Sequence, residues 1–303
     1  MIRRAVKDTL HPRNRFRAGY DFPQLVEASP ALGRFVKPNA FGDTSIDFAD
    51  AEAVTALNRA LLAHAYGLAA WDVPPGYLCP PIPSRSDYLH HLADLLGRAG
   101  AGPVRGPTVA VLDIGTGASC IYPLIGASEY GWRFVAADID PVALAWARRL
   151  VAAHPAVAGL VDCRLQPSGR ECFSGVVTGA ETFALSMCNP PFHASAQEAA
   201  EANRRKRRHL GVATRPGREL NFGGTSGELW CAGGEVAFIA RMIAQSAARP
   251  ELCRWFTTIV SKREHLDPLY DRLEEVSVAD VETIEMAHGQ KKSRILAWTF
   301  TPP

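Results

Sequence analysis

The residues best suited to chemistry form the tetrapeptide Asn189-Pro190-Pro191-Phe192, which follows an apolar segment at 183–188. Proline fixes φ and has no N–H, so two prolines in succession hold a turn rigid without helical or ladder hydrogen bonds. The Asn189 amide and the Pro190 carbonyl are then left as acceptors, with the ring of Phe192 beside them. A planar amine, such as the N6 of adenine, can donate one hydrogen to each acceptor and stack on that ring. Because the acceptors also stabilise the charge that develops when the nitrogen attacks a methyl donor, the motif indicates methyl transfer, with an ordinary strand-ending turn as the alternative.

A second group of residues suits a nucleoside-like cofactor. An apolar strand expected at 108–114 carries Asp113 and leads into Gly115-Thr116-Gly117. Glycines in this place allow a tight turn and a close approach of the backbone to a ligand at the carboxyl end of the strand. Cys120 occupies the position of the third glycine of a dinucleotide site, which argues against NAD. Asp138 ends the next strand, where a carboxylate can accept both ribose hydroxyls, so S-adenosylmethionine, which has no phosphates, fits the pattern.

An α/β fold is expected to position both groups. From residue 108 onward, short β-branched runs alternate with helical patterns. Strands are expected at 108–114, 133–139, 161–165, 183–188, 255–260, 276–286 and 295–300, and helices after 117 and at 141–153, 234–248 and 264–276. This alternation predicts a mostly parallel sheet. The two closing strands have no helix between them, so they predict an antiparallel addition at one edge of the sheet.

The first hundred residues have a different pattern. Apolar residues recur at helical spacing over 51–66 and again over 86–96, and the proline-rich segment 73–83 between them should be extended and stiff. A segment rich in glycine and proline, 100–107, then leads into the first strand. We therefore expect a mainly helical N-terminal extension, 1–100, followed by a domain at 101–303 that carries both groups of candidate site residues.

Composition limits the class of protein. The chain has 303 residues, 47% of them hydrophobic, and a formal net charge of +2, so it can form a sizeable core but has no global attraction to polyanions. Its seven cysteines are scattered and have no CxxC spacing, which makes a disulfide framework or a zinc site improbable and favours a reducing cytoplasm. No segment has the pattern of a signal peptide or a membrane span. We expect a soluble cytoplasmic protein that needs no metal.

Taken together, these motifs and several further segments resemble the bacterial 23S ribosomal RNA adenine-N6 methyltransferase family, which is related to eukaryotic methyltransferase-like RNA N6-adenine methyltransferases. The matching segments are His11-Pro12-Arg13-Asn14-Arg15, Ile46-Asp47-Phe48, Leu78-Cys79-Pro80-Pro81, residues 114–124, Cys188-Asn189-Pro190-Pro191-Phe192, Gly233-Gly234-Glu235-Val236 and residues 289–298. The resemblance extends from about 11 to 300. It implies a Rossmann-like, S-adenosylmethionine-dependent methyltransferase fold over 101–303, with a mostly parallel seven-stranded sheet and an antiparallel edge strand.

The same resemblance implies methyl transfer from S-adenosylmethionine to the N6 of one adenine in 23S rRNA, with Asn189, Pro190, Pro191 and Phe192 as the catalytic motif. It also implies that Arg85 reaches the methionine carboxylate of the cofactor; the family alone favours that role over a solvated surface arginine. The segment 166–170, where the family contacts the adenine side of the cofactor, differs here, and no residue in it is assigned.

Basic residues gather where RNA would have to bind. Arg13 and Arg15 belong to a basic N-terminal segment, Lys291 lies beside the closing strands, and five consecutive basic residues follow the Asn-Pro-Pro-Phe motif. The five are Arg204, Arg205, Lys206, Arg207 and Arg208. Such clusters bind phosphates with strongly salt-dependent affinity, although a run of charge often forms only a solvated face. The expected partner is 23S rRNA or a large-subunit assembly particle.

Two alternatives stay open on the sequence. The Asn189 to Phe192 motif tolerates any planar nitrogen, so DNA adenine or a protein glutamine side chain is a possible acceptor. A non-catalytic rRNA-binding assembly factor could retain the same fold. The intact motif argues against the second alternative, because a binding protein does not need both acceptors.

Overall fold

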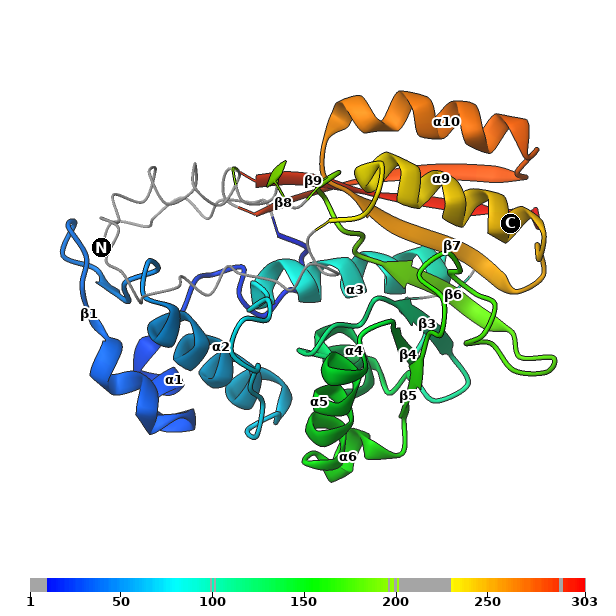
Figure 1. Ribbon diagram of the computed structural model, residues 1–303. Coiled ribbons are helices and arrows are strands. Elements are labelled where there is room, and N and C mark those ends of the chain that lie inside the picture. The colour runs from blue at the N-terminus through cyan, green and yellow to red at the C-terminus, as the bar shows by residue number, and fades with distance from the viewer. Residues whose placement is uncertain are drawn as a thin grey trace.

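A seven-stranded sheet forms the centre of the molecule (Figure 1). The computed structural model describes residues 10–98, 100, 102–195, 197, 198, 201, 230–288 and 291–302. The strands are β3 (Ala110–Ile114), β4 (Arg133–Asp138), β5 (Val161–Leu165), β6 (Phe183–Cys188), β7 (Cys253–Val260), β8 (Asp280–His288) and β9 (Lys291–Thr299). Their order is β5-β4-β3-β6-β7-β9-β8, and β9 pairs antiparallel with both of its neighbours. The expected mostly parallel sheet with an antiparallel addition at one edge is confirmed; the antiparallel strand lies between β7 and the edge strand β8.

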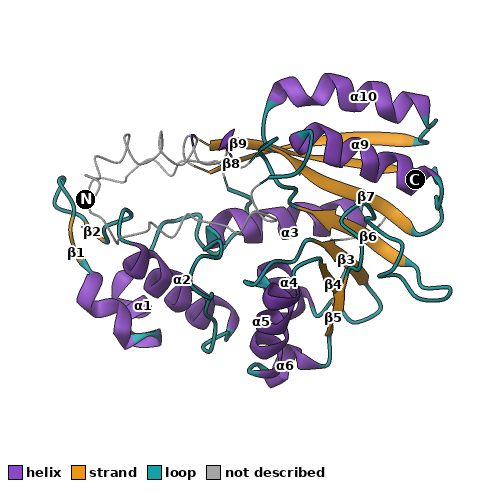
Figure 2. Ribbon diagram, in the orientation of Figure 1, coloured by secondary structure: helices purple, strands orange, loops and turns teal. Residues whose placement is uncertain are grey.

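Helices cover both faces of the sheet (Figure 2). One face is covered by α3 (Ile82–Gly97), α4 (Ile121–Tyr130), α5 (Pro141–Ala152) and the short α6 (Pro155–Ala158), and the other by α9 (Gly234–Ala247) and α10 (Leu266–Glu275). Successive strand residues point to opposite faces, and on β3 Val111 belongs to the first apolar cluster while Leu112 belongs to the second. The central strands are buried on both faces, which is why they read as continuous apolar runs.

The N-terminal part consists of α1 (Phe22–Ala28), a 3₁₀ helix η1 (Pro30–Phe35), the short strands β1 (Lys37–Pro38) and β2 (Thr44–Ser45), and α2 (Ala51–Tyr66). Helix α2 has the expected bounds because Asp50 caps its first N–H groups and Gly67 ends it at φ +69°. Side chains of α1 and α2 pack in the same apolar cluster as α3 and the sheet. The division of the chain near residue 100 stays a prediction.

Several boundaries differ from those expected. Helix α3 starts at Ile82 rather than at residue 86, because Pro83 fits the first turn, where no N–H partner is needed. The expectation that 73–83 is extended is therefore wrong for its last two residues, and it is also wrong at 74–77, where the Tyr77 N–H donates to the Pro74 carbonyl at 3.2 Å in a turn. The helix expected at 264–276 is a 3₁₀ turn, η2 (Arg263–His265), followed by α10. No helix in the described part of the chain combines the length and the apolar character that a membrane span requires.

Candidate active site

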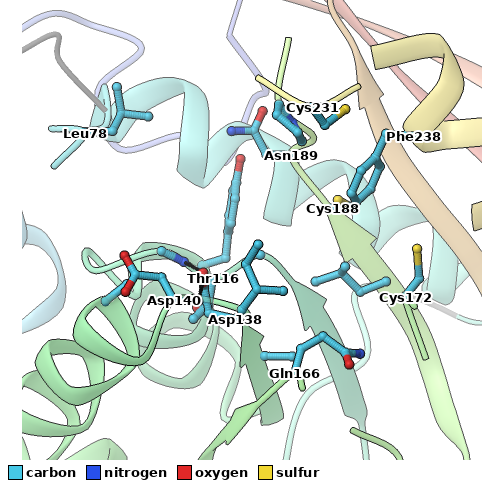
Figure 3. Close-up of a pocket in the computed structure, with 18 of the residues that line it drawn as sticks. Leu78, Thr116, Asp138, Asp140, Gln166, Cys172, Cys188, Asn189, Cys231 and Phe238 are labelled. Carbon is cyan, nitrogen blue, oxygen red and sulfur yellow. Dashed lines mark hydrogen bonds between the residues drawn. The ribbon is translucent and has the colours of Figure 1, made fainter. Parts of the chain in front are cut away.

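A cavity of about 410 Å³ lies at the carboxyl ends of β3, β4 and β6 (Figure 3). This is the crevice in which open parallel sheets bind their ligands. Thr116, Asp138 and Asp140 lie on one side of it, Asn189 and Cys231 on another, and Gln166 at its lower end. Most of the residues assigned to the cofactor from the sequence are among those that line it: Arg85, Gly115, Gly117 and Asp138.

The glycine loop after β3 is fastened to β4. Gly115 and Gly117 have φ values of +77° and +65°, which other residues rarely adopt. The N–H groups of Gly115 and Thr116 both donate to the Ala137 carbonyl at 2.9 Å, and the Gly117 N–H donates to Asp138 Oδ2 at 2.7 Å. A Cβ added to Gly115 would meet no atom within 4 Å. The loop therefore presents bare backbone to open space, as a closely approaching ligand requires.

Asp138 is the carboxylate at the floor of the cavity. In addition to the Gly117 bond, its Oδ1 accepts the Asp140 N–H at 2.9 Å. Burial raises the pKa of Asp138, and the backbone donors oppose that rise. An ionised carboxylate has about four acceptor positions, so Asp138 retains positions for ligand hydroxyls. Asp140 is oriented in turn by the Tyr77 hydroxyl, which donates to its Oδ2 at 2.7 Å.

Asp113 has a different position from the other candidates. It lies on β3 immediately before the loop, its side chain is completely buried, and it is not among the residues that line the cavity. Neither of its carboxylate oxygens is paired in a hydrogen bond with the described part of the chain. Burial raises the pKa of Asp113 to about 7, and the neighbouring Asp138 carboxylate acts in the same direction. A direct contact between Asp113 and the cofactor stays a prediction.

Arg85 is carried by α3 and reaches the cavity from the side of the N-terminal half. It is buried, its Nη1 donates to the Tyr122 hydroxyl at 3.1 Å, and its guanidinium lies 5.6 Å from the centre of the Tyr122 ring. No acidic side chain neutralises it through an ion pair among the described residues. A buried arginine in this state is suited to an anionic ligand group.

Asn189 stands where two cavities meet. It follows β6, and its Oδ1 is buried without a hydrogen-bond partner in the described structure. A second, smaller cavity of about 60 Å³ is lined by Phe192, Ser84, Ser261 and Met286, and it shares Arg85 and Asn189 with the first. Pro191 lines the larger cavity. Asn189 therefore lies at the boundary of the two cavities, and Phe192 lines the smaller one.

A buried polar chain fixes the strand that leads into Asn189. The Tyr88 hydroxyl of α3 is 2.7 Å from Thr257 Oγ1, and the Thr257 hydroxyl donates to the Ser186 carbonyl at 2.8 Å. Three elements, α3, β7 and β6, are therefore linked four residues before the turn at Pro190. Such a link keeps the turn in place without using the groups of the turn itself.

The residues expected to contact RNA have varied surroundings. Arg13 is held by Asp94 Oδ1 at 2.6 Å, by the His90 carbonyl at 2.8 Å and by the Tyr130 hydroxyl at 3.2 Å, whereas Arg15 is half-exposed and pairs with Glu129 at 2.7 Å. Lys291 is the first residue of β9, opposite His288. The basic run 204–208 lies outside the described residues. RNA contacts by all of these residues stay predictions.

Sequence reasoning missed several residues of the site. Tyr122, which orders Arg85, lies in the first turn of α4 behind the glycine loop, and Leu78 and Pro80 bring the proline-rich segment to the cavity. Gln166 lines the cavity, but its amide is engaged with the Ser174 carbonyl at 3.0 Å and the Ser168 N–H at 3.0 Å. Two signals pointed toward Gln166, its position directly after a strand and its place in the segment 166–170 singled out by the family resemblance, but no residue was assigned there. Within the described ranges, no group of three or more His, Cys, Asp or Glu side chains could hold a metal ion.

Comparisons with known proteins agree with this geometry. A family model described as RNA methyltransferase matches residues 4–302. The "Ribosomal RNA large subunit methyltransferase F" of Serratia proteamaculans is 53% identical over 97% of this chain and 88% of its own length, and that of Methylobacillus flagellatus is 53% identical over 97% and 92%. Among solved structures, the catalytic domain of human METTL16 in complex with the MAT2A 3′UTR hairpin 1 is similar with a TM-score of 0.81 at 33% identity, over 97% of this chain and 98% of that one. The N-terminal domain of human METTL16 in complex with SAH has a TM-score of 0.76 at 29% identity, over 96% and 99%.

Proposed function

The chain belongs to the RNA methyltransferase family, and from this premise we propose that it transfers the methyl group of S-adenosylmethionine to the N6 of one adenine in 23S rRNA. The relatives named for the large ribosomal subunit support the RNA, and the human structures solved with an RNA hairpin and with SAH support both the type of acceptor and the donor. All seven cysteines, each within the described part of the chain, are free thiols, which supports the further proposal that the enzyme acts in the cytoplasm.

The larger cavity fits S-adenosylmethionine by the chemistry of its donors and acceptors. Asp138 offers acceptors for the ribose hydroxyls, and the loop at Gly115 leaves room for close backbone approach. Arg85, which forms no ion pair with the described residues, offers a cation for the methionine carboxylate. When bound there, S-adenosylmethionine supplies an electrophilic methyl carbon on a sulfonium sulfur. Nothing in the site requires a metal for this chemistry.

One observation carries the proposal: the buried Asn189 Oδ1 has no hydrogen-bond partner within the described structure, at the boundary of the two cavities. A buried acceptor without a donor costs free energy, and a ligand that brings an N–H group recovers it. The N6 amine of adenine has two such hydrogens. In the proposed complex one goes to Asn189 Oδ1 and the other to the Pro190 carbonyl, while the base stacks on Phe192.

The residues of the chain then act on the nitrogen rather than on the methyl group. The adenine N6 lone pair is delocalised into the ring, and two acceptors on its hydrogens favour a more tetrahedral nitrogen whose lone pair can form the new N–C bond. As that bond forms, nitrogen acquires positive charge, which the Asn189 and Pro190 oxygens stabilise because they are already oriented. One N6 proton then leaves to solvent, and the products are N6-methyladenine and S-adenosylhomocysteine.

Methyl transfer can be measured with methyl-labelled S-adenosylmethionine and 23S rRNA from cells that lack this modification, for the wild type and for Asn189→Ala. We expect label in the rRNA with the wild type, its recovery as N6-methyladenine after nucleoside digestion, and almost none with Asn189→Ala. A matched control is Asn39→Ala, in the turn between β1 and β2 and outside both cavities.

The same assay separates the alternatives. Duplex DNA and a glutamine-containing ribosomal peptide replace the rRNA in parallel reactions, and label in either one in preference to rRNA would replace the proposed acceptor. A wild-type protein that binds rRNA but transfers no methyl group to naked rRNA or to assembly particles would instead favour a non-catalytic assembly factor. Equal transfer by the wild type and Asn189→Ala would contradict the assigned role of Asn189.

A further inference from the structure

A buried glutamate, Glu235, lies beside the smaller cavity and is not used by the chemistry described above. It belongs to the first turn of α9, and its side chain is fully buried. Its Oε1 accepts the Ser261 N–H at 2.9 Å, and its Oε2 accepts the Ser261 hydroxyl at 3.0 Å and lies 2.5 Å from His265 Nδ1. Three donors therefore converge on one carboxylate. Such a pattern offsets the large cost of burying a charge.

One partner of Glu235, Ser261, lines the smaller cavity. Ser261 directly follows β7, the strand that pairs with β6, and it lines the cavity together with Asn189 and Phe192. His265 ends η2, the turn that continues from Ser261 into α10. Glu235 thus fastens the chain at the point where it leaves the sheet beside the catalytic turn.

The chain at the start of α9 also lies against the segment that follows Phe192. A Cβ placed on Gly234 would lie 3.4 Å from Ala194, and the Cys231 N–H donates to the His193 carbonyl at 3.1 Å. His193 follows Phe192 directly. The same turn of helix is therefore in contact with the segment after Phe192 and, through Glu235, with Ser261.

We infer that Glu235 is a positioning residue for methyl transfer, which sets the spacing between the Asn189 to Phe192 turn and the Ser261 wall of the cavity that receives the target base. This inference rests on the proposed function, because it requires a base in that cavity. A displacement of about 1 Å of a reacting group can cost on the order of a hundredfold in rate, so a linkage two contacts away from the nitrogen is sufficient to affect turnover.

The most informative substitution is Glu235→Gln, which keeps the volume and one oxygen. The second oxygen becomes an NH₂ group, so the Ser261 hydroxyl and His265 Nδ1, which face Oε2 in the wild type, would have to accept a hydrogen bond instead of donating one. We expect kcat for methyl transfer to fall about ten- to hundredfold, while the KM and Kd for S-adenosylmethionine change less than about twofold, because neither Ser261 nor His265 lines the larger cavity. Hydrogen exchange in peptides covering 189–195 and 258–266 should become faster.

His265 provides a test by conservative replacement. His265→Asn keeps a donor close to the position of Nδ1 and should retain kcat within about threefold, whereas His265→Ala leaves Glu235 with one partner fewer and should behave like Glu235→Gln. The matched control is Glu264→Gln, one residue earlier, whose exposed side chain lies 3.7 Å from Lys262. It should leave kcat, hydrogen exchange and melting temperature unchanged.

Two results would overturn the inference while the proposed function stands. The first is an active wild type whose kcat is retained in Glu235→Gln. The second is a loss of kcat that disappears when rates are normalised to folded protein, with melting temperature falling in parallel, because Glu235 would then only stabilise the fold. A wild type that transfers no methyl group to RNA would instead remove the proposed function and this role with it, whatever hydrogen exchange reports about the Ser261 wall.

Discussion

The two ends of the larger cavity differ in how their polar groups are paired. At the end formed by β3 and β4, Asp138 accepts backbone N–H groups from Gly117 and Asp140, and Tyr77 donates to Asp140. At the β6 end, the buried Asn189 Oδ1 and Trp230 Nε1 have no hydrogen-bond partners in the described part of the molecule. At the first end the Asp138 and Asp140 carboxylates are held by hydrogen bonds within the protein, whereas at the second end Asn189 and Trp230 each have a group without a partner among the described residues.

This difference indicates that the two ends are coupled to folding in different ways. Where the same carboxylate holds the glycine loop and offers acceptors to a ligand, a substitution should affect affinity and stability together. Where an acceptor has no partner within the protein, its removal should affect only the reaction. Substitutions at each end, measured for turnover, cofactor affinity and the free energy of unfolding, therefore test this contrast.

The largest effect is expected for Asn189→Ala. Loss of an oriented acceptor should lower kcat by about 10²- to 10³-fold, while the free energy of unfolding changes by less than about 1 kcal/mol, because Asn189 Oδ1 has no hydrogen-bond partner among the described residues. Single-turnover methylation, calorimetric titration with S-adenosylmethionine and urea unfolding would measure the three quantities. Asn189→Asp, which keeps both acceptor positions, should retain more activity than Asn189→Ala. A large loss of stability in Asn189→Ala would contradict the contrast.

Asp138→Ala is expected to affect the other end. It removes the acceptor for two backbone N–H groups as well as the proposed ribose acceptor. We expect the Kd for S-adenosylmethionine to rise about 10- to 100-fold and the free energy of unfolding to fall by about 1–3 kcal/mol. Asp138→Asn, which keeps one acceptor oxygen, should be intermediate in both. A weakened affinity at unchanged stability would mean that the glycine loop holds its shape without Asp138.

The pH dependence of stability tests the buried carboxyl behind the loop. Folding raises the pKa of Asp113 from 3.8 to about 7, so the folded state holds the proton more tightly. Its contribution to stability is therefore present below about pH 4 and is lost as the pH rises through about 7. Asp113→Asn removes this loss, and the variant should be about 1–3 kcal/mol more stable than the wild type at pH 8, with a much smaller difference at pH 5.

Urea unfolding at the two pH values measures the difference for Asp113→Asn. The control is Asp271→Asn on the exposed face of α10, which should give no such pH-dependent gap. A gap for Asp113→Asn that is the same at pH 5 and pH 8 would contradict the stated pKa. The cofactor is left out of these measurements, so that affinity and stability are not mixed.

The sequence predicted which residues lie at the site better than it predicted the hydrogen bonds between them. Strand-ending residues such as Asp138 and Asn189 could be assigned because parallel strands bring their carboxyl ends to one edge of the sheet. The bounds of α2 were predictable because Asp50 and Gly67 are local signals. Partners distant in the chain were not predictable. The hydrogen bond between Tyr122 and Arg85 depends on how α4 packs, and those between Glu235 and Ser261 depend on how α9 packs. No local sequence pattern encodes this packing.

The same limit applies to residues with two possible roles. Arg13 was assigned to RNA from the basic composition of its segment, yet in the fold it contacts Asp94, Tyr130 and the His90 carbonyl. The aspartate and the tyrosine are more than 80 residues away in the chain, so composition could not reveal them. Charge pattern indicates a partner of opposite charge, but only the fold shows whether that partner is within the protein.

The smallest effect is expected for Arg15, and it extends the contrast to the RNA-facing residues. Arg15→Ala should lower the free energy of unfolding by less than about 1 kcal/mol, because its ion pair with Glu129 is half-exposed. If Arg15 contacts a phosphate, the slope of log Kd for 23S rRNA against log salt concentration should become shallower by about one. Filter binding at several salt concentrations would measure the slope, with Arg272→Ala, an exposed ion-pair partner of Glu275 on α10, as the control. An unchanged slope together with the expected loss of stability would show that Arg15 stabilises the fold and does not contact RNA.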